Sequence, residues 1–342
     1  MNDFSAFSSR ATIADVAARA GVSTATVSRV MNGTGPVSEQ TADRVWAAIA
    51  DLNYAPHSGA REMAAVSRPK TLGLILPTAG GYFFSEMLQG IESAVGGHDL
   101  LIHVTNAPAG EREAFFLPLN EHNTAGLLVF ANSLSVEAIR ALHERSLPMV
   151  LLHCTPPPDL ALPSVVFENM AGARRVVEHL IDVHGCRRIA FLAGPEEVED
   201  AGLRFDGYRQ ALTGRRLVYD EAFVGQGGYD DRLAETAVSR WLAEGKQFDA
   251  IFAADDASAV GALTALRKAG RRVPEDVALV GFDDAPLSRH LSPPLTTVRA
   301  PIAAAGAAAA EQLLQLIETG QRCGQMTLAT EIVIRRSCGC ED

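Results

Sequence analysis

The chain has 342 residues, of which 47% are hydrophobic and 21% charged, and its formal net charge at pH 7 is −11. This length and apolar content exceed the needs of one ordinary core and predict more than one domain. Neither end resembles an export signal or a membrane anchor, so we expect a cytoplasmic protein that begins with a disordered tail at residues 1–10. Five cysteines, an odd number, do not resemble the disulfide framework of a secreted protein.

The distribution of charge restricts how the chain could bind nucleic acid. Residues 1–70 contain seven Arg or Lys and six Asp or Glu, a net charge of +1, so the remainder carries −12. An acidic body repels DNA phosphates, which are bound through basic contacts. The charge therefore favours DNA binding through the N-terminal end and argues against a protein that coats nucleic acid.

Residues 11–32 have the spacing of two short helices around a tight turn. Thr12 can cap the first helix, and Asp15 interacts favourably with its exposed amides. Gly21 marks its end, where a positive φ is cheap only for glycine. The residues expected on its inner face are Ile13, Val16, Ala17 and Ala20. We therefore predict a helix-turn-helix.

A second helix is predicted to begin at Ser23, with its valines inward and a small, polar outer face. Such a face fits the DNA major groove, with Arg29 in position to bind a guanine edge. A third helix over 39–52 would complete a three-helix core. The alternative is an ordinary helical hairpin in a larger fold. The residues left on the outer face of the second helix are Thr24, Ala25, Ser28, Arg29 and Asn32.

Residues 56–64 form a short segment before the polar linker at 67–70. The segment is too short to be a stable helix alone, and Gly59 raises the entropic cost of ordering it. A plain interdomain linker is the alternative interpretation.

Beyond residue 70, apolar runs alternate with helical segments. Runs bounded by Gly or Pro are typical of buried parallel strands joined by crossover helices. We expect one sheet from 71–76, 100–104, 126–130 and 149–153, and a second from 165–167, 188–192, 250–253 and 277–282. An alanine-rich helix is expected over 303–317. A ligand would bind beyond the carboxyl ends of the strands.

Short motifs lie in a characteristic order along nearly the whole chain. After residues 12–32 they occupy 37–38, 52–56, 60–61, 72–74, 90–92, 179–181, 188–191, 281–284 and 294–298. In this order they resemble the lactose-repressor (LacI/GalR) family of bacterial transcription regulators.

The resemblance implies an all-α helix-turn-helix headpiece at 11–56, a hinge helix and linker at 57–69, and an α/β periplasmic-binding-protein-like body at 70–342. The body would consist of two doubly wound parallel-sheet lobes. The N-lobe would contain about 70–166 and 298–325, and the C-lobe about 167–297 and 326–342. The chain would cross between the lobes near residues 167, 298 and 325.

The resemblance also implies which residues bind DNA. In the family the hinge helix pairs with its twin in the minor groove and inserts a leucine between bases; here Met63 holds that position, and methionine is apolar enough to act as a wedge. The full DNA-binding set is Thr12, Ser23, Thr24, Ala25, Thr26, Ser28, Arg29, Asn32, Tyr54, Arg61 and Met63.

The same resemblance implies an effector cleft between the lobes. Arg204 and Asp283 match residues that hold effector oxygens, and Asp255 stands where asparagine is common. Two carboxylates, one arginine and several rings suit a neutral sugar or polyol. Alternatively, the aromatic residues belong to the core, while Asp256 and Asp284 cap loops or helices. The cleft set is Phe83, Phe84, His153, Arg204, Tyr229, Asp255, Asp283 and Ile302.

Other groups give weak signals. His179 and His184 lie five apart, off a common helical face, and are interpreted as surface or core residues. Cys338 and Cys340 lack evident partner ligands and are interpreted as a lone pair, so no metal or cofactor is expected.

The leading hypothesis is therefore a ligand-controlled repressor that binds a palindromic operator. A homodimer is expected, because no leucine heptad follows residue 336 to join dimers into a tetramer. A sugar-binding protein without DNA function is the alternative. An enzyme is disfavoured, since no activated nucleophile, metal cluster or phosphate loop is evident.

Overall fold

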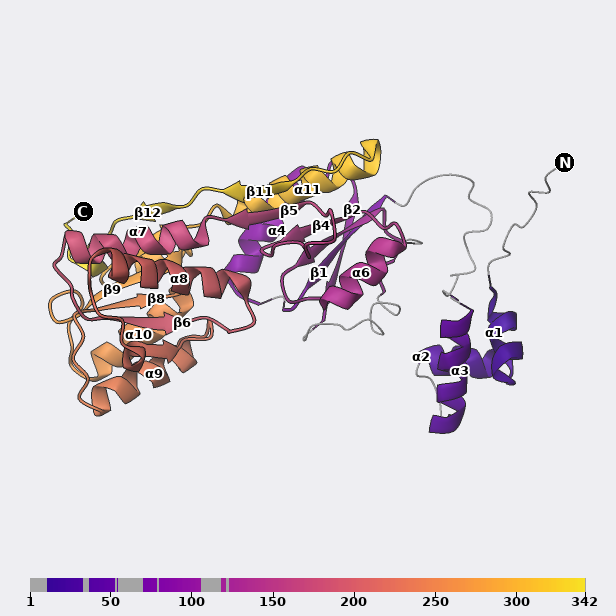
Figure 1. The fold of residues 1–342 in the computed structure, drawn as a ribbon, viewed down its shortest axis with the longest axis horizontal. Helices are drawn as coiled ribbons and strands as arrows, with labels where there is room; N and C mark the ends of the chain where they lie inside the picture. The colour runs from indigo at the N-terminus through magenta and orange to yellow at the C-terminus, as the bar shows by residue number, and fades with distance from the viewer. Residues whose placement is uncertain are drawn as a thin grey trace. The chain divides into compact units, whose positions relative to one another are not determined.

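A computed structural model describes residues 11–32, 37–52, 54, 70–78, 80–105, 118–120 and 123–341. They fall into two compact units, 11–54 and 70–341 (Figure 1). The predicted tail at 1–10 and the whole predicted hinge and linker at 57–69, including Arg61 and Met63, lie outside the described residues. No described helix is long and apolar enough to cross a membrane.

The N-terminal unit is a three-helix headpiece, and the predicted helix-turn-helix is confirmed. Thr12 and Asp15 form a reciprocal capping box at the start of the first helix, and Gly21 ends it with φ +66°. Val16, Val27 and Val45, one from each helix, are fully buried. The helices are α1 (Ile13–Ala20), α2 (Thr24–Asn32) and α3 (Glu39–Asp51).

The N-lobe of the second unit contains a parallel six-stranded sheet in the order β11-β5-β4-β3-β1-β2. Its strands are β1 (Thr71–Leu76), β2 (Asp99–Val104), β3 (Gly126–Phe130), β4 (Met149–Leu152), β5 (Ser164–Phe167) and β11 (Gln325–Leu328). Alternate side chains of the central strands pack either with α4 (Tyr82–Ala94) and α11 (Ile302–Thr319) or with α6 (Val136–Glu144). The sheet is therefore covered on both faces.

The C-lobe contains a second sheet in the order β12-β10-β9-β8-β6-β7, parallel except for the edge strand β12. Its strands are β6 (Ile189–Ala193), β7 (Val224–Gln226), β8 (Ala250–Ala253), β9 (Ala278–Asp283), β10 (Thr296–Arg299) and β12 (Glu331–Val333). Figure 1 shows α7 and α8 over one face and α9 and α10 over the other. These helices are α7 (Asn169–Asp182), α8 (Glu199–Gly214), α9 (Asp231–Ala243) and α10 (Asp256–Lys268).

Two details of the sequence prediction are wrong. Strand β5, assigned above to the second sheet, pairs with β4 and β11 in the first. Because β11 also belongs to the first sheet, the third passage between lobes follows Leu328 instead of lying near residue 325. The other two passages follow Phe167 and Arg299.

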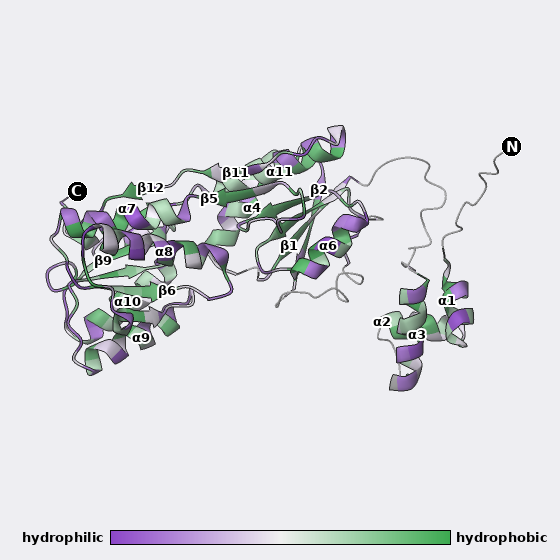
Figure 2. Ribbon diagram, viewed as in Figure 1, coloured by the Kyte–Doolittle hydropathy of each residue, from purple (hydrophilic) through white to green (hydrophobic). Residues whose placement is uncertain are grey.

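The lobes have continuous apolar interiors. Strands are mainly hydrophobic, whereas the helices carry both hydrophobic and hydrophilic residues (Figure 2). Helices α4 and α11 approach closely, since a Cβ at Gly90 would lie 1.9 Å from the Ala303 carbonyl oxygen. Phe84 and Phe282, one from each lobe, belong to the same buried cluster. The lobes are therefore in contact, and the carboxyl ends of their strands face a shared region.

Candidate functional site

Helix α2 presents the small polar surface that its sequence predicted. Thr24, Ala25 and Arg29 are exposed, whereas Val27 is buried. Ser23 precedes the helix, and its hydroxyl oxygen accepts a hydrogen bond of 3.1 Å from the Thr26 amide. This cap fixes the start of α2.

The remaining predicted DNA-binding residues differ in exposure. Thr12 is exposed, but its hydroxyl caps α1. Ser28 and Thr26 are half-buried, and Asn32 ends α2. Tyr54 is only 9% exposed and packs in the headpiece core, where burial raises its pKa. Its ring therefore supports the headpiece.

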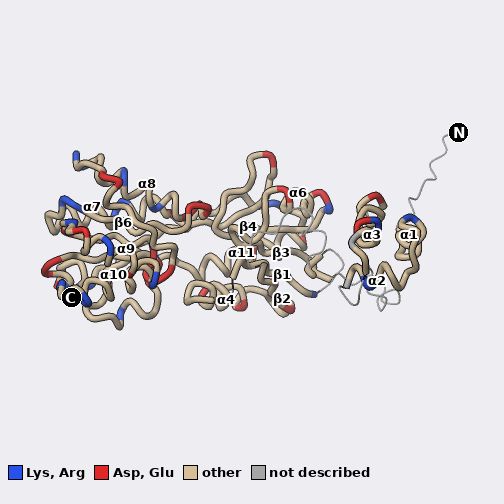
Figure 3. The backbone as a smooth tube through the Cα atoms, turned by 90° about the horizontal axis from the view of Figure 1, so that it is seen from below, with Lys and Arg blue, Asp and Glu red and all other residues tan. Residues whose placement is uncertain are grey.

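Charges of both signs are interspersed along the described chain (Figure 3). In the headpiece, an exposed ion pair joins α1 to α3, with 2.7 Å between Arg19 Nη2 and Asp51 Oδ2. Arg29 is the basic residue in the last turn of α2.

A buried ion pair lies at the predicted effector cleft. Arg204, on α8, is 3% exposed, and its Nη2 lies 3.1 Å from Oδ1 of Asp283 at the end of β9. Its Nε donates to Asn169 Oδ1 at 2.9 Å, and its Nη1 donates to the Ala254 carbonyl at 2.6 Å. Burial is the largest single influence and lowers the Arg204 pKa. Asp283, Tyr229, Asp200 and Asp255 together outweigh burial, so the pKa lies above its ordinary value.

Polar side chains continue this pair across the interlobe boundary. Asn169 Nδ2 donates to Asp200 Oδ1 at 2.7 Å, and Asp200 Oδ2 lies 3.4 Å from Nδ1 of His153. His153 follows β4 in the N-lobe, whereas Asn169 and Asp200 begin α7 and α8. Sequence reasoning missed Asn169 and Asp200, although both are polar residues in first helical turns near strand ends, where ligand-binding side chains gather.

Aromatic rings enclose the N-lobe end of this network. The centroid of the His153 ring lies 5.0 Å from those of Phe83 and Phe130 and 4.6 Å from that of Phe167. Phe84 contacts both Phe83 and Phe130. The two predicted phenylalanines thus belong to one aromatic cluster around His153.

A second group of rings surrounds Arg204. Its guanidinium carbon lies 3.8 Å from the centroid of the Phe282 ring and 5.7 Å from that of Tyr229. Ile302, predicted to line the cleft, is 2% exposed and packs in the hydrophobic core at the start of α11. Its contacts are those of a core residue.

Several buried polar atoms lack a hydrogen-bond partner in the described part of the chain. They include Tyr229 Oη, Ser258 Oγ and both ring nitrogens of His153, so the 3.4 Å approach of His153 to Asp200 is not a hydrogen bond. Buried polar groups are nearly always hydrogen-bonded, so a cluster of unpaired ones is typical of a site that accepts a polar ligand.

The backbone is strained at three of the predicted cleft residues. His153 has φ +61°, Tyr229 φ +58° and Asp283 φ +103°. Such conformations are costly for residues other than glycine and occur preferentially at ligand-binding sites. Positive φ also occurs at four other described non-glycine residues, so it supports the site only together with the contacts: Asn132, Ser146, Arg216 and Asp284.

Asp255, which was predicted to line the effector cleft, caps a helix in the structure. Its carboxylate caps α10, accepting from the amides of Ser258 at 3.0 Å and Ala257 at 3.2 Å. Burial, with the nearby Asp283 carboxylate, raises its pKa to about 6. Its side chain is thus held at the cleft by the helix that it caps.

The neighbouring aspartates Asp256 and Asp284 bind groups in and around the segment after β9. Asp256 accepts from the Ala285 amide at 2.8 Å and from the hydroxyls of Ser288 and Thr297. Asp284 forms ion pairs with two arginines, Arg299 and Arg335. Both carboxylates therefore hold the segment that follows β9.

Two open pockets flank the polar network. One, of about 480 Å³, lies between α4 and the segment after β9 and includes Asp283. The other, of about 420 Å³, includes Asn169 and Phe167 near the first passage between the lobes. Each pocket is thus bordered by one residue of the network, Asp283 or Asn169.

Family models match both units. Residues 12–57 match the model described as bacterial regulatory proteins, lacI family, and residues 177–338 match a periplasmic binding protein-like domain.

Curated relatives match along most of the chain. The HTH-type transcriptional regulator GalS of Salmonella typhimurium strain LT2 is 33% identical over 307 residues, covering 89% of each chain. The HTH-type transcriptional repressor PurR of Aliivibrio fischeri strain ES114 is 33% identical over 314 residues, covering 90% of this chain and 92% of that one.

Solved structures share the fold. A complex of the transcriptional regulator CelR with cellobiose has a TM-score of 0.71 and 31% identity, covering 96% of this chain and all of that one. The lac repressor dimer bound to operator and the anti-inducer ONPF has a TM-score of 0.69 and 28% identity, covering 96% and 99%. These similar proteins are regulators, and none is described as an enzyme.

Proposed function

The chain belongs to the lacI family of bacterial regulatory proteins, and from that premise we propose that this DNA-binding transcription regulator represses its target as a homodimer on a near-palindromic operator. A small-molecule effector held between the lobes would control it. Repression is supported by the names of the relatives, which include repressors. A regulator of this kind acts in the cytoplasm, where the operator lies.

On the DNA side, the exposed face of α2 supports major-groove binding. Its small residues permit close approach, and Arg29 supplies the long donor side chain that binds guanine most often. Two headpieces in a dimer would bind two half-sites. Residues 57–69 would act as the hinge, with Met63 as the wedge in the minor groove.

On the effector side, the charges support a neutral polyhydroxyl ligand. Arg204 is already paired with Asp283, and the buried Asp200 and Asp255 lie nearby. A dianionic ligand would meet this excess of carboxylates, while the Arg204 guanidinium is already paired with Asp283. A sugar instead offers hydroxyls for the unpaired Tyr229 and Ser258 oxygens, and CelR, a structural relative, was solved with cellobiose.

The single observation that carries the proposal is the polar network from His153 of the N-lobe to Asp283 of the C-lobe. A ligand that contacts both ends would favour one relative placement of the lobes. The effector need only bind one placement of the lobes a few kcal/mol more tightly than the other. Such a difference suffices to change operator affinity about tenfold to a hundredfold.

The test is selection of bound sequences from random duplex DNA by the purified full-length protein, with and without cellobiose. We expect an enriched palindrome with two equal half-sites, and reduced enrichment in the Arg29→Ala variant. Enrichment of single half-sites would contradict the dimer. Failure to enrich any sequence, combined with calorimetric binding of cellobiose, would favour a sugar-binding protein without DNA function.

A further inference from the structure

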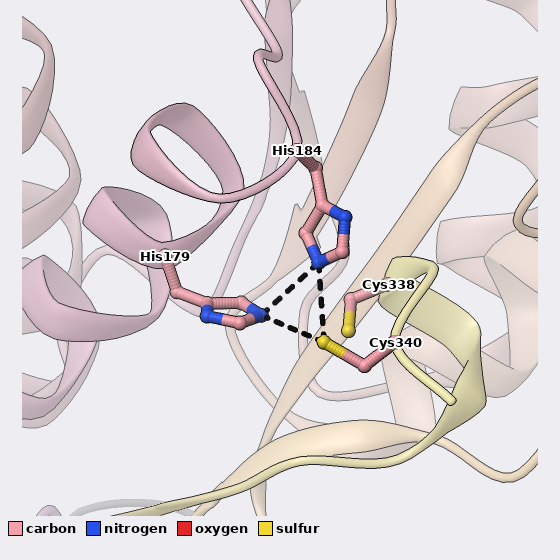
Figure 4. Close-up of side chains that lie close together, drawn as sticks. All are labelled: His179, His184, Cys338 and Cys340. Carbon is pink, nitrogen blue, oxygen red and sulfur yellow. Dashed lines mark hydrogen bonds between the residues drawn. The ribbon is translucent and has the colours of Figure 1, made fainter. Parts of the chain in front are cut away.

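Four potential metal ligands from two distant parts of the chain lie together at the end of the C-lobe. They are His179, His184, Cys338 and Cys340, and their ligand atoms all lie within 4.8 Å of one another (Figure 4). The interpretation of the cysteines as a lone pair without partner ligands is therefore wrong, since both histidines lie beside Cys340. Three of these residues are half-buried, and Cys338 is 2% exposed.

The distances within this cluster match those of a tetrahedral metal site. His179 Nε2 and His184 Nε2 are 3.2 Å apart, and Cys340 Sγ lies 3.7 Å and 3.4 Å from them. Zinc bonds of about 2.1 Å to nitrogen and about 2.3 Å to sulfur require edges of roughly 3.4 Å between nitrogens and roughly 3.6 Å between nitrogen and sulfur. An ion placed between these three atoms would lie about 2 Å from each of them, which is close to the zinc bond lengths.

The local backbone explains how the four side chains meet. Helix α7 ends at Asp182, so His184 lies in the turn beyond it and can face His179. Gly339 has φ +108°, a conformation that favours glycine and turns the chain sharply between the two cysteines. A Cβ on Gly339 would lie 3.2 Å from His184 Nδ1, so the glycine also permits the His184 ring to approach.

We propose that His179, His184, Cys338 and Cys340 bind one zinc ion in tetrahedral coordination. Two nitrogens and two sulfurs form the donor set typical of zinc, and two thiolates balance its double charge. The thiol protons are released on binding. Cys338 Sγ lies within 4.8 Å of the other three ligand atoms, where it accepts from the Thr296 hydroxyl at 3.1 Å and donates to the Arg335 carbonyl at 3.3 Å. Zinc binding would replace the hydrogen bond that this thiol donates.

Four protein ligands leave no position for water or substrate, so this site is structural. The ion would join the C-terminal segment after η3 (Arg336–Cys338) to the end of α7. The first residue of α7, Asn169, accepts the hydrogen bond from Arg204 Nε. Zinc would therefore stabilise the helix that supports the polar network.

The first test measures metal in the wild-type chain. The full-length protein is purified under reducing conditions, incubated with Zn²⁺, desalted and analysed by mass spectrometry for metal content. We expect about one zinc per chain. Replacement by Co²⁺ should give the visible absorption of a tetrahedral ion together with a thiolate-to-Co²⁺ charge-transfer band. Absence of stoichiometric zinc, or a Cys338–Cys340 disulfide under these conditions, would overturn the proposal.

The second test assigns the ligands by substitution. The double variant Cys338→Ser/Cys340→Ser should lose the bound zinc and the charge-transfer band, and His184→Ala should lose most of the zinc. Cys323→Ser is the matched control, because this cysteine lies outside the cluster, and it should keep full stoichiometry. Retention of zinc by a folded double variant, judged by circular dichroism, would place the ion elsewhere. None of these measurements depends on operator or effector binding.

Discussion

The Arg204 guanidinium lies 3.1 Å from the Asp283 carboxylate, and the two side chains are 3% and 15% exposed. Asp283 holds this position with φ +103°, at the end of a buried strand. A buried pair of this kind gains little net stability while it is intact, but it leaves an uncompensated charge when one partner is lost. Substitution of either residue therefore tests both the folding and the binding role of the cleft.

Asp283→Asn should lower the free energy of unfolding by about 3 to 5 kcal/mol, because Arg204 would remain buried without its carboxylate. Urea denaturation of the full-length protein measures the change. Asp159→Asn is the matched control, since Asp159 pairs with Arg140 on the exposed surface, and it should cost less than about 1 kcal/mol. Equal decreases in the free energy of unfolding of both variants would show that breaking the buried pair costs no more than breaking an exposed one.

Gly194→Ala should weaken effector binding more than it weakens folding. A Cβ at this position would lie 2.6 Å from two atoms of the Tyr229 ring, so the ring must shift within the cleft. Calorimetric titration with cellobiose compares the variants. Gly202→Ala, on α8, meets nothing within 4 Å and should leave affinity unchanged and stability equal or up to about 1 kcal/mol higher. Unchanged affinity in Gly194→Ala would remove Tyr229 from the proposed site.

Sequence pattern predicted the elements whose signals are local. The headpiece follows from apolar residues at helical spacing and from Gly21, whose positive φ ends α1 where the sequence indicated. Strands β1 and β3 are continuous apolar runs and were predicted at their observed bounds. In contrast, β11 and β12 are short edge strands of four and three residues, and three of the four residues in β11 are exposed. Their pairing partners lie far away in sequence, which no local pattern reveals.

The family resemblance pointed to the cleft residues one at a time, and not to the network that joins them. Arg204 and Asp283 were expected to face a ligand separately, and the structure pairs them with each other. Asn169 was missed because its role depends on the approach of two helices, α7 and α8. The histidine pair was misjudged because helical periodicity was applied across the end of α7 at Asp182.

Asp255→Asn should change how stability depends on pH. Burial and Asp283 raise the Asp255 pKa from 3.8 to about 6. Between pH 3.8 and about 6, the Asp255 carboxyl is therefore more protonated in the folded protein than in the unfolded chain. Its contribution to stability is complete below pH 3.8 and is lost as the pH rises through about 6. Asparagine keeps a helix cap and removes the titration.

We therefore expect Asp255→Asn to gain stability relative to the wild type as the pH rises from about 4 to about 7, on the order of 3 kcal/mol for a shift of about two pKa units. Urea denaturation at several pH values measures this difference. A constant offset between the two proteins across that range would show that Asp255 has the same pKa in the folded and unfolded states.

Arg29→Ala should weaken operator binding by about 1 to 3 kcal/mol, roughly tenfold to a hundredfold in Kd, because a bidentate contact to guanine would be lost. Arg29 is exposed on α2, so thermal unfolding of the headpiece should stay unchanged. Arg240→Ala removes an equally positive, 62% exposed side chain from the C-lobe and controls for net charge. Fluorescence anisotropy on the selected operator compares the three proteins at fixed salt. A base contact predicts that Arg29→Ala loses discrimination at one position of each half-site, whereas a phosphate contact would weaken all sequences equally and reduce the salt dependence.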